Sequence, residues 1–199
     1  DDAIAALGTT TTPLVVGCRL RVLANASIPA TTALVMTNAG IICPDTGTTT
    51  TINAFIESAS RQIFCTGAGT ILIAGSRNLA IYSEWWGANP NDSAINNVPL
   101  RAAVAAITPG GGMIRFACGS YHFSGNIEIP SFISLRGTGM QCTKLINDGT
   151  TDLLTFTDST TANKELRFGG IFDMSIQGNS ASGHGVVVEN PYHFSADLV

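Results

Sequence analysis

Charged residues are scarce in this chain. Of its 199 residues, 10 are Lys or Arg and 14 are Asp or Glu, which gives a net charge of −4. The charged fraction of 12% is about half that of an ordinary globular domain. No basic stripe exists that would neutralise a phosphate backbone, so we expect no nucleic-acid partner. Thr, Ala, Asn, Ser and Gly replace the missing charges, and these residues suit pleated sheets and closely stacked backbones.

Long hydrophobic runs and paired cysteine motifs are also lacking. No apolar run approaches the ~18 residues that cross a bilayer, so the sequence predicts no membrane span. The five cysteines are widely separated and form no CxxC pair: Cys18, Cys43, Cys65, Cys118 and Cys142. This spacing gives little support for zinc. We therefore expect five small buried hydrophobic side chains rather than disulfides, and we predict no metal and no cofactor.

Helical patterns and hairpin turns are nearly absent, whereas short strands are frequent. Asp148-Gly149 is the lone hairpin candidate. A two-residue hydrophobic period predicts strands. They lie within 14–24, 31–43, 50–57, 61–65, 69–75, 112–123, 126–137, 143–148, 153–158, 170–178, 184–190 and 194–199. No helix separates the later strands, so they are not βαβ units. A parallel β-solenoid and an antiparallel sandwich with irregular loops both fit this pattern.

One segment is a convincing helix, Pro99–Ile107. Asn97 is the expected N-cap, and Pro109-Gly110 ends the helix. Leu100, Val104 and Ile107 fall on one face at i, i+4 and i+7. A coiled sheet has an open hydrophobic end that must be covered. We expect this short helix to cover the beginning of the coil.

In a coiled sheet the alternation also predicts which side chains point inward. The inward set is Ile114, Phe116, Ile127, Ile129, Ile133, Leu135, Leu154, Phe156, Phe172, Met174 and Ile176. The outward set is Arg115, Glu128, Arg136, Thr155, Asp173, Ser175 and Gln177. Stacked aliphatic side chains would then provide the main stabilising term.

An ordered series of motifs in Tyr82–Ile146 resembles the opening of the pectate-lyase-like superfamily of right-handed parallel β-helices. The series is Trp86-Gly87-Ala88, Asp92-Ser93, the Ala-rich helix, Gly111-Gly112, Gly119-Ser120-Tyr121, Ile129-Pro130-Ser131 and Leu135-Arg136-Gly137-Thr138-Gly139. Phe172–Asn190 resembles a later coil. The Asp-Gly-x-x-Asp-Asp run usual before the helix is reduced to "NPNDSAINN".

The resemblance implies an all-β, right-handed parallel β-helix with a short N-terminal capping helix and a strand-rich prefix. It divides the chain into a prefix or stem over residues 1–81 and a helix with the first coils over 82–199. We expect the chain to be a piece of a longer protein, truncated at its C-terminus. In this arrangement Tyr82 and the adjacent Trp85 and Trp86 pack where the prefix meets the helix. The alternative for the two indoles is a sugar-stacking platform.

The resemblance also implies a function on polysaccharides. The first hypothesis is a virion-associated tailspike or tail fibre, a homotrimer that contacts other virion proteins and binds, and in some cases depolymerises, host surface polysaccharide. The second is a secreted bacterial polysaccharide lyase or glycoside hydrolase. The third is a non-catalytic structural stem or adaptor. The expected location is the virion tail or the extracellular space.

No catalytic motif of the family matches residue by residue, so candidate catalytic residues come from outward carboxylates late in the chain. Asp173, Glu189 and Asp197 would lie on successive coils about 4.8 Å apart, a spacing that permits a hydrolytic dyad. Each of them also fits a solvated carboxylate. His184 fits a turn, and His122 and His193 fit packing at the rim. Asp148 and Asp152 flank a Gly-Thr turn and are weak candidates for a cation.

Overall fold

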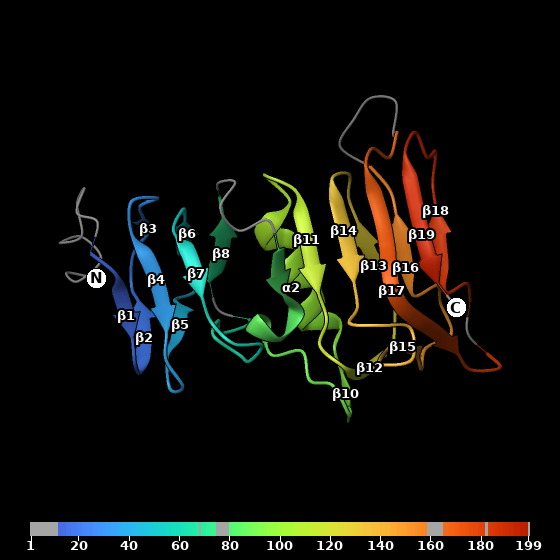
Figure 1. The fold of residues 1–199 in the computed structure, drawn as a ribbon, viewed down its shortest axis with the longest axis horizontal. Coiled ribbons are helices and arrows are strands. Elements are labelled where there is room, and N and C mark those ends of the chain that lie inside the picture. The colour runs from blue at the N-terminus through green and yellow to red at the C-terminus, as the bar shows by residue number, and fades with distance from the viewer. Residues whose placement is uncertain (1–11, 68, 75–79, 159–164, 182, 199) are drawn as a thin grey trace.

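The computed structural model describes residues 12–67, 69–74, 80–158, 165–181 and 183–198. In Figure 1 these residues form a row of short strands stacked along the long axis, with the helix near the middle. The first set of strands is β1 Leu14–Val16, β2 Arg19–Val22, β3 Ala26–Ile28, β4 Ala33–Met36, β5 Ile41–Pro44, β6 Thr49–Ile52, β7 Phe55–Glu57 and β8 Thr70–Ile73.

The second set begins with β9 Ala80–Tyr82, the 3₁₀ helix η1 Ser83–Trp86, β10 Asp92–Ile95 and α2 Asn97–Ile107. It continues with β11 Gly112–Arg115, β12 Gly119–Phe123, β13 Ile127–Ile129, β14 Ile133–Arg136, β15 Thr143–Asn147, β16 Leu154–Phe156, β17 Gly169–Gly178, β18 Val186–Val188 and β19 Phe194–Leu198.

The paired strands run parallel, and each strand pairs with its counterpart one coil later. The early sheets are β1-β4-β7, β2-β5 and β3-β6-β8. The later sheets are β13-β16-β18 and an eight-stranded sheet that runs β10-β12-β15-β17-β14-β11-β9, with β19 paired to β17. The long strand β17 therefore belongs to two faces of the coil. This topology confirms the predicted parallel β-helix and excludes the antiparallel sandwich.

Inward side chains line up from coil to coil. Ile81 pairs with Ile114, Ile114 with Leu135, and Leu135 with Ile171, and all four side chains are fully buried. Phe172 is an error in the predicted inward set, because the buried Ile171 takes the inward position and Phe172 pairs with the outward Arg136. Asp173 has a left-handed backbone with φ 55°, and this corner restarts the alternation so that Met174 points inward.

Thr155 departs from the prediction in the opposite direction. It was expected outside but is only 8% exposed, and its hydroxyl donates to Asn126 Oδ1 at 2.9 Å. The hydrogen bond satisfies the hydroxyl in place of water.

The helix α2 has the predicted buried face but a different position in the fold. Leu100, Val104 and Ile107 are at most 6% exposed. The helix packs against β8 on one side and β13 on the other, taking the place of a strand on that face of the coil. Strands β1 to β8 already form parallel coils, so the helix lies inside the stack and does not cover its beginning.

Asn97 is not the N-cap, because the helix already includes it and the N-cap is Asn96. The Asn97 side chain instead accepts from the Ser124 N–H and donates to the Gly125 carbonyl. These bonds tie the first turn of the helix to the following coil. Within the described residues, no helix is both long and apolar enough to pass through a membrane.

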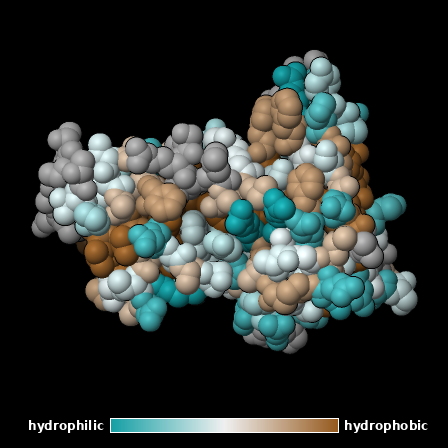
Figure 2. All heavy atoms as spheres, viewed as in Figure 1, coloured by the Kyte–Doolittle hydropathy of each residue, from teal (hydrophilic) through white to brown (hydrophobic). Residues whose placement is uncertain are grey.

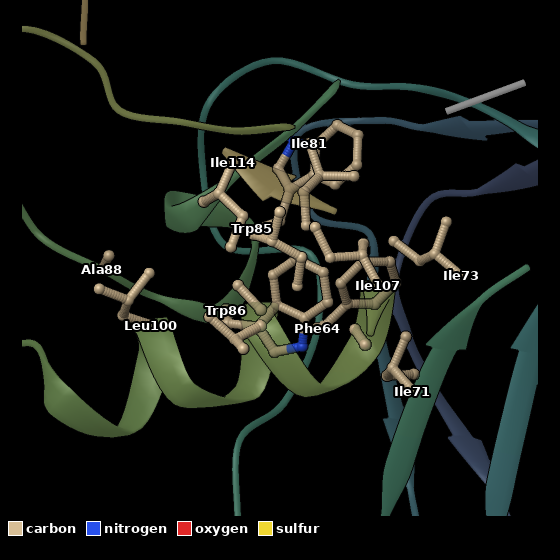
Figure 3. Packing of buried hydrophobic residues seen from close by; sticks show 14 of the residues in the cluster. Phe64, Ile71, Ile73, Ile81, Trp85, Trp86, Ala88, Leu100, Ile107 and Ile114 are labelled. Carbon is tan, nitrogen blue, oxygen red and sulfur yellow. The ribbon is translucent and has the colours of Figure 1, made fainter. Parts of the chain in front are cut away.

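The two tryptophans join the early coils to the helix. Trp85 and Trp86 are 3% and 2% exposed, and Figure 3 shows them gathered with Phe64 and Ile107 beside α2. The Trp85 carbonyl accepts the N–H groups of Ile63 and Phe64, so η1 extends the ladder of the early coils. The indoles are packing residues, and their burial removes the alternative of a sugar platform.

Four of the five cysteines correct the expectation of unpaired thiols. Cys43 pairs with Cys65 and Cys118 with Cys142, each pair with Cα atoms 4.8 Å apart. Both disulfides join equivalent positions on neighbouring coils. The remaining Cys18 is exposed, which corrects the expectation of burial.

Thr50 is an unfavourable residue of the early core. It is fully buried, and within the described residues its hydroxyl has no hydrogen-bond partner. Valine has nearly the same shape without the hydroxyl. We expect Thr50→Val to raise the free energy of unfolding by about 1 kcal/mol, because it removes an unsatisfied buried group. Chemical denaturation with urea measures the change, and a loss of stability would contradict it.

Candidate functional site

One outward column crosses the face built by β9, β11, β14, β17 and β19. The strand registers pair Tyr82 with Arg115, Arg115 with Arg136, Arg136 with Phe172, and Phe172 with Asp197. Each of these residues follows the buried or inward position of its strand, so its side chain lies on the outer surface. Neighbouring parallel strands are about 4.8 Å apart. Successive coils thus present an aromatic ring, two cations, a second ring and a carboxylate in single file.

A groove of about 470 Å³ lies at the carboxyl ends of these strands. Its lining consists of Tyr82, Arg115, Phe116, Arg136, Gly137, Thr138, Gly139 and Asp173. Figure 2 shows hydrophilic surface in teal near the ends of β11 and β14. The lining holds two arginines and one carboxylate, so the groove carries positive charge in a protein of net charge −4.

Asp173 and Arg136 form a fixed pair on one side of the groove. The Arg136 Nε lies 2.7 Å from Asp173 Oδ2. The left-handed backbone of Asp173 also points its carbonyl at the Gly139 N–H, 3.0 Å away. A Cβ at position 137 would lie 2.3 Å from the Asp173 carbonyl oxygen, so the Gly137 turn can approach only because it has no side chain.

Arg115 is the free cation of the groove. Its side chain is exposed, and within the described part of the chain no hydrogen bond or ion pair holds its guanidinium. A guanidinium presents five N–H donors in a planar fork that matches a carboxylate. Arg136 uses Nε for Asp173, which leaves its terminal nitrogens for another acceptor. The two side chains can therefore bind an anionic ligand together.

No family model, curated protein or solved structure matches the chain. The assignment of a function therefore depends on the geometry of this face and on the sequence motifs.

The structure places the three candidate catalytic carboxylates in different surroundings. Asp173 is engaged by Arg136, and Asp197 lies on the adjacent strand β19, exposed. Glu189 follows β18 on another sheet, where its Oε2 accepts from the Thr157 hydroxyl at 2.8 Å. Asp173 and Asp197 are thus brought to neighbouring coils, and Glu189 is not brought to them. Catalysis by these three residues stays a prediction.

Two of the three histidines, His122 and His184, pair with carboxylates on neighbouring coils, whereas the His193 ring lies against Phe168. His122 Nδ1 lies 2.7 Å from Asp148 Oδ2, and His184 Nδ1 lies 3.0 Å from Asp152 Oδ1. The His184 N–H and imidazole lower the pKa of the Asp152 carboxyl below its usual value. Each of these aspartates pairs with one histidine. The described residues contain no group of three or more side chains that could bind a metal ion together.

Sequence reasoning identified Arg115 and Arg136 as outward residues but did not identify them as neighbours in one groove. A signal was present, since "MIRF" and "SLRG" both place an arginine directly after an inward aliphatic residue. The sequence did not reveal the number of residues in each coil, and this number determines that Arg115 and Arg136 are neighbours. Tyr82 was assigned to packing at the helix, and the structure places it at the edge of the groove as well.

Proposed function

We propose that the chain binds an acidic polysaccharide along the outer face of β9, β11, β14 and β17. The observation that carries the proposal is the pair of exposed guanidinium groups, Arg115 and Arg136, on neighbouring strands of one groove. A carboxylate, sulfate or phosphate on a sugar would pair with the free fork of Arg115 and with the terminal nitrogens of Arg136.

The shape of this face also suits a polymer. Tyr82 and Phe172 flank the two arginines on the adjoining strands. Aromatic side chains combine a broad apolar surface with, in tyrosine, a polar tip, and this combination matches the apolar faces and hydroxyl rims of pyranose rings. Repeated contacts on one face suit a ligand that also repeats.

The resemblance to the pectate-lyase-like superfamily supports a tailspike or tail-fibre role, in which a homotrimer on a virion tail binds host surface polysaccharide. The two disulfides support an extracellular location, because such bonds persist in oxidising environments. They also favour the second candidate, a secreted polysaccharide lyase or hydrolase. Tyr82 with two arginines in one groove supports the lyase form, since uronate lysis needs a base and a group that neutralises the carboxylate.

The test is binding to immobilised polygalacturonate, alginate, hyaluronate and polysialate. We expect Arg115→Ala and Arg136→Ala each to weaken binding by about 10-fold or more, because each removes a charge-assisted hydrogen bond. The loss should shrink as salt rises. The matched control is Arg19→Ala, an exposed arginine on β2 in the early coils, which should bind like the unmodified protein.

Two further measurements separate the alternatives. Appearance of unsaturated uronate absorbance or of reducing ends would show an enzyme, and a stable trimer by sedimentation would favour the spike. Absence of binding to all four acidic polymers would overturn the proposed function and favour a structural stem.

A further inference from the structure

A column of exposed aromatic rings borders the opposite edge of the same face. Gly111, Phe132, Phe168 and His193 each directly precede a strand of this sheet, and the strand registers place them on successive coils. The rings of Phe132 and Phe168 stack with centroids 5.6 Å apart, and those of Phe168 and His193 lie 5.5 Å apart. Figure 2 shows hydrophobic surface in tan where β14 and β17 begin.

The backbone at this corner is unfavourable for phenylalanine. Phe132 and Phe168 have φ values of 66° and 52°, and Gly111 has 68° at the equivalent position one coil earlier. A bulky residue is strained in this region, whereas glycine is not. Phe132 and Phe168 are also 51% and 57% exposed. Both residues therefore combine a strained backbone with an exposed ring. This combination is typical of a side chain retained for contact with a ligand.

The stack ends at Phe132 on the side of the earlier coil. Positions 110 and 111 are both glycine, so neither places a side chain beside the ring, and a Cβ at position 110 would meet nothing within 4 Å. A side chain at position 111 would collide with Phe132, whose Cβ lies 2.7 Å from the Cβ site. The Phe132 ring is thus half exposed at the end of the stack, with open space at Gly110 on the preceding coil.

We propose that Phe132, supported by Phe168, is a sugar-binding subsite at which the apolar face of a pyranose ring packs on the phenyl ring. The subsite rests on the proposed function and deepens it. Phe132 directly precedes the strand that Arg136 ends, and four residues of extended chain separate the two by about 13 Å. One glycan that crosses the face would contact the ring with an apolar sugar face and the arginines with an acid group. The ligand is then an acidic oligosaccharide long enough to bridge both edges.

The area of the column argues against a protein partner. Buried aromatic side chains cover 150–250 Å² each, so Phe132, Phe168 and Tyr192, each half or more exposed, offer roughly 300 Å² in total. A stable protein interface needs about 800 Å² from each partner. Polar groups flank the column, including the ion pair of Arg167 with Glu165 at 3.2 Å. A narrow aromatic strip with polar sides fits a sugar chain better than a second copy.

The test is Phe132→Gly, which removes the ring and relieves the backbone strain at once. We expect a melting temperature within about 3 °C of the unmodified protein, together with about tenfold weaker binding of the acidic polysaccharide that binds best. The loss should be equal at low and high salt, because the contact is apolar, whereas Arg136→Ala should flatten the salt dependence. Phe55→Ala, a phenylalanine of 48% exposure on β7, is the matched control and should change nothing.

Each other outcome is decisive. If Phe132→Gly binds normally while the arginine variants do not, the subsite is wrong and the proposed function stands. If no acidic polymer binds the unmodified protein, both proposals fall. If Phe132→Gly keeps its glycan affinity but turns an oligomer into a monomer in sedimentation, the column is a self-association surface and the subsite is overturned.

Discussion

Replacing Trp86 with alanine is expected to lower the free energy of unfolding by about 3–5 kcal/mol, as for other buried aromatic residues. The indole is 2% exposed and lies against Phe64, with ring centroids 4.9 Å apart. Its removal would leave a cavity between the last early coil and α2. The loss is a large fraction of the 5–15 kcal/mol that stabilises a typical domain.

The position of Trp86 also predicts a change in the number of unfolding transitions, in addition to the loss of free energy. In a solenoid each coil contacts only its neighbours, so a weakened junction uncouples the two sides. Urea unfolding followed by circular dichroism should separate into two transitions in Trp86→Ala, and hydrogen exchange should show residues 14–73 opening first. Phe55→Ala is the control for the loss of an exposed ring. Equal stability of these two variants would show that the junction does not depend on the indole.

The interior of the coil was predictable from the sequence because strand alternation is a local signal. Ile114, Leu135 and Phe156 are buried as expected. The alternation fails where the backbone leaves the extended region, at Asp173 with φ 55°. No pattern of hydrophobic residues announces such a corner, so a single alternation through Phe172 and Met174 gives the right face for Met174, beyond the corner, and the wrong face for Phe172, before it. The prediction for Phe172 failed for this reason.

Contacts between coils were not predictable, because they depend on the number of residues in each coil. The disulfide partners are 22 and 24 residues apart, and in both cases this separation equals one complete coil. The loops differ in length, so that Ile114 pairs with Leu135 but Leu135 pairs with Ile171. Arg115 and Arg136 are neighbours for the same reason, because the number of residues between them equals one coil. A sequence read strand by strand gives each residue's face but not its neighbour.

The disulfides also alter the balance between the functional hypotheses. Unpaired cysteines would have agreed with assembly inside a reducing cell, whereas two bonds between adjacent coils agree with an oxidising environment. Each bond restrains the chain at a coil boundary, one on each side of α2. Under the proposed function, a glycan-binding protein outside the cell would benefit from such restraint.

Glu84 is the residue for which we expect the second large effect. It is 3% exposed, and its Oε1 accepts from the Ala117 N–H at 2.8 Å and from the Tyr121 hydroxyl. The Ser83 hydroxyl donates to Oε2 at 3.3 Å. The carboxylate thus joins η1 to the turn between β11 and β12 on the next coil. Its removal would leave buried donors without an acceptor, at a cost of about 1–3 kcal/mol for each.

We expect Glu84→Ala to lower the free energy of unfolding by about 3–5 kcal/mol, and Glu84→Gln by less, because the amide oxygen can still accept. Glu128→Gln is the matched control, since Glu128 is exposed on β13. Urea denaturation at neutral pH measures all three variants. Similar stability of Glu84→Ala and the control would show that water replaces the carboxylate.

Alkaline pH provides an independent test of the same network. Burial and the Glu84 carboxylate raise the pKa of Tyr121 above its ordinary value of 10.0, so the folded protein keeps a proton that the unfolded chain loses. The stabilisation is complete below about pH 10 and falls as the pH rises beyond it, by up to about 1.4 kcal/mol per pH unit. Tyr121→Phe should be less stable at neutral pH but should lose less stability between pH 9 and 11. Parallel curves for the two proteins over this range would contradict the pairing of Tyr121 with Glu84.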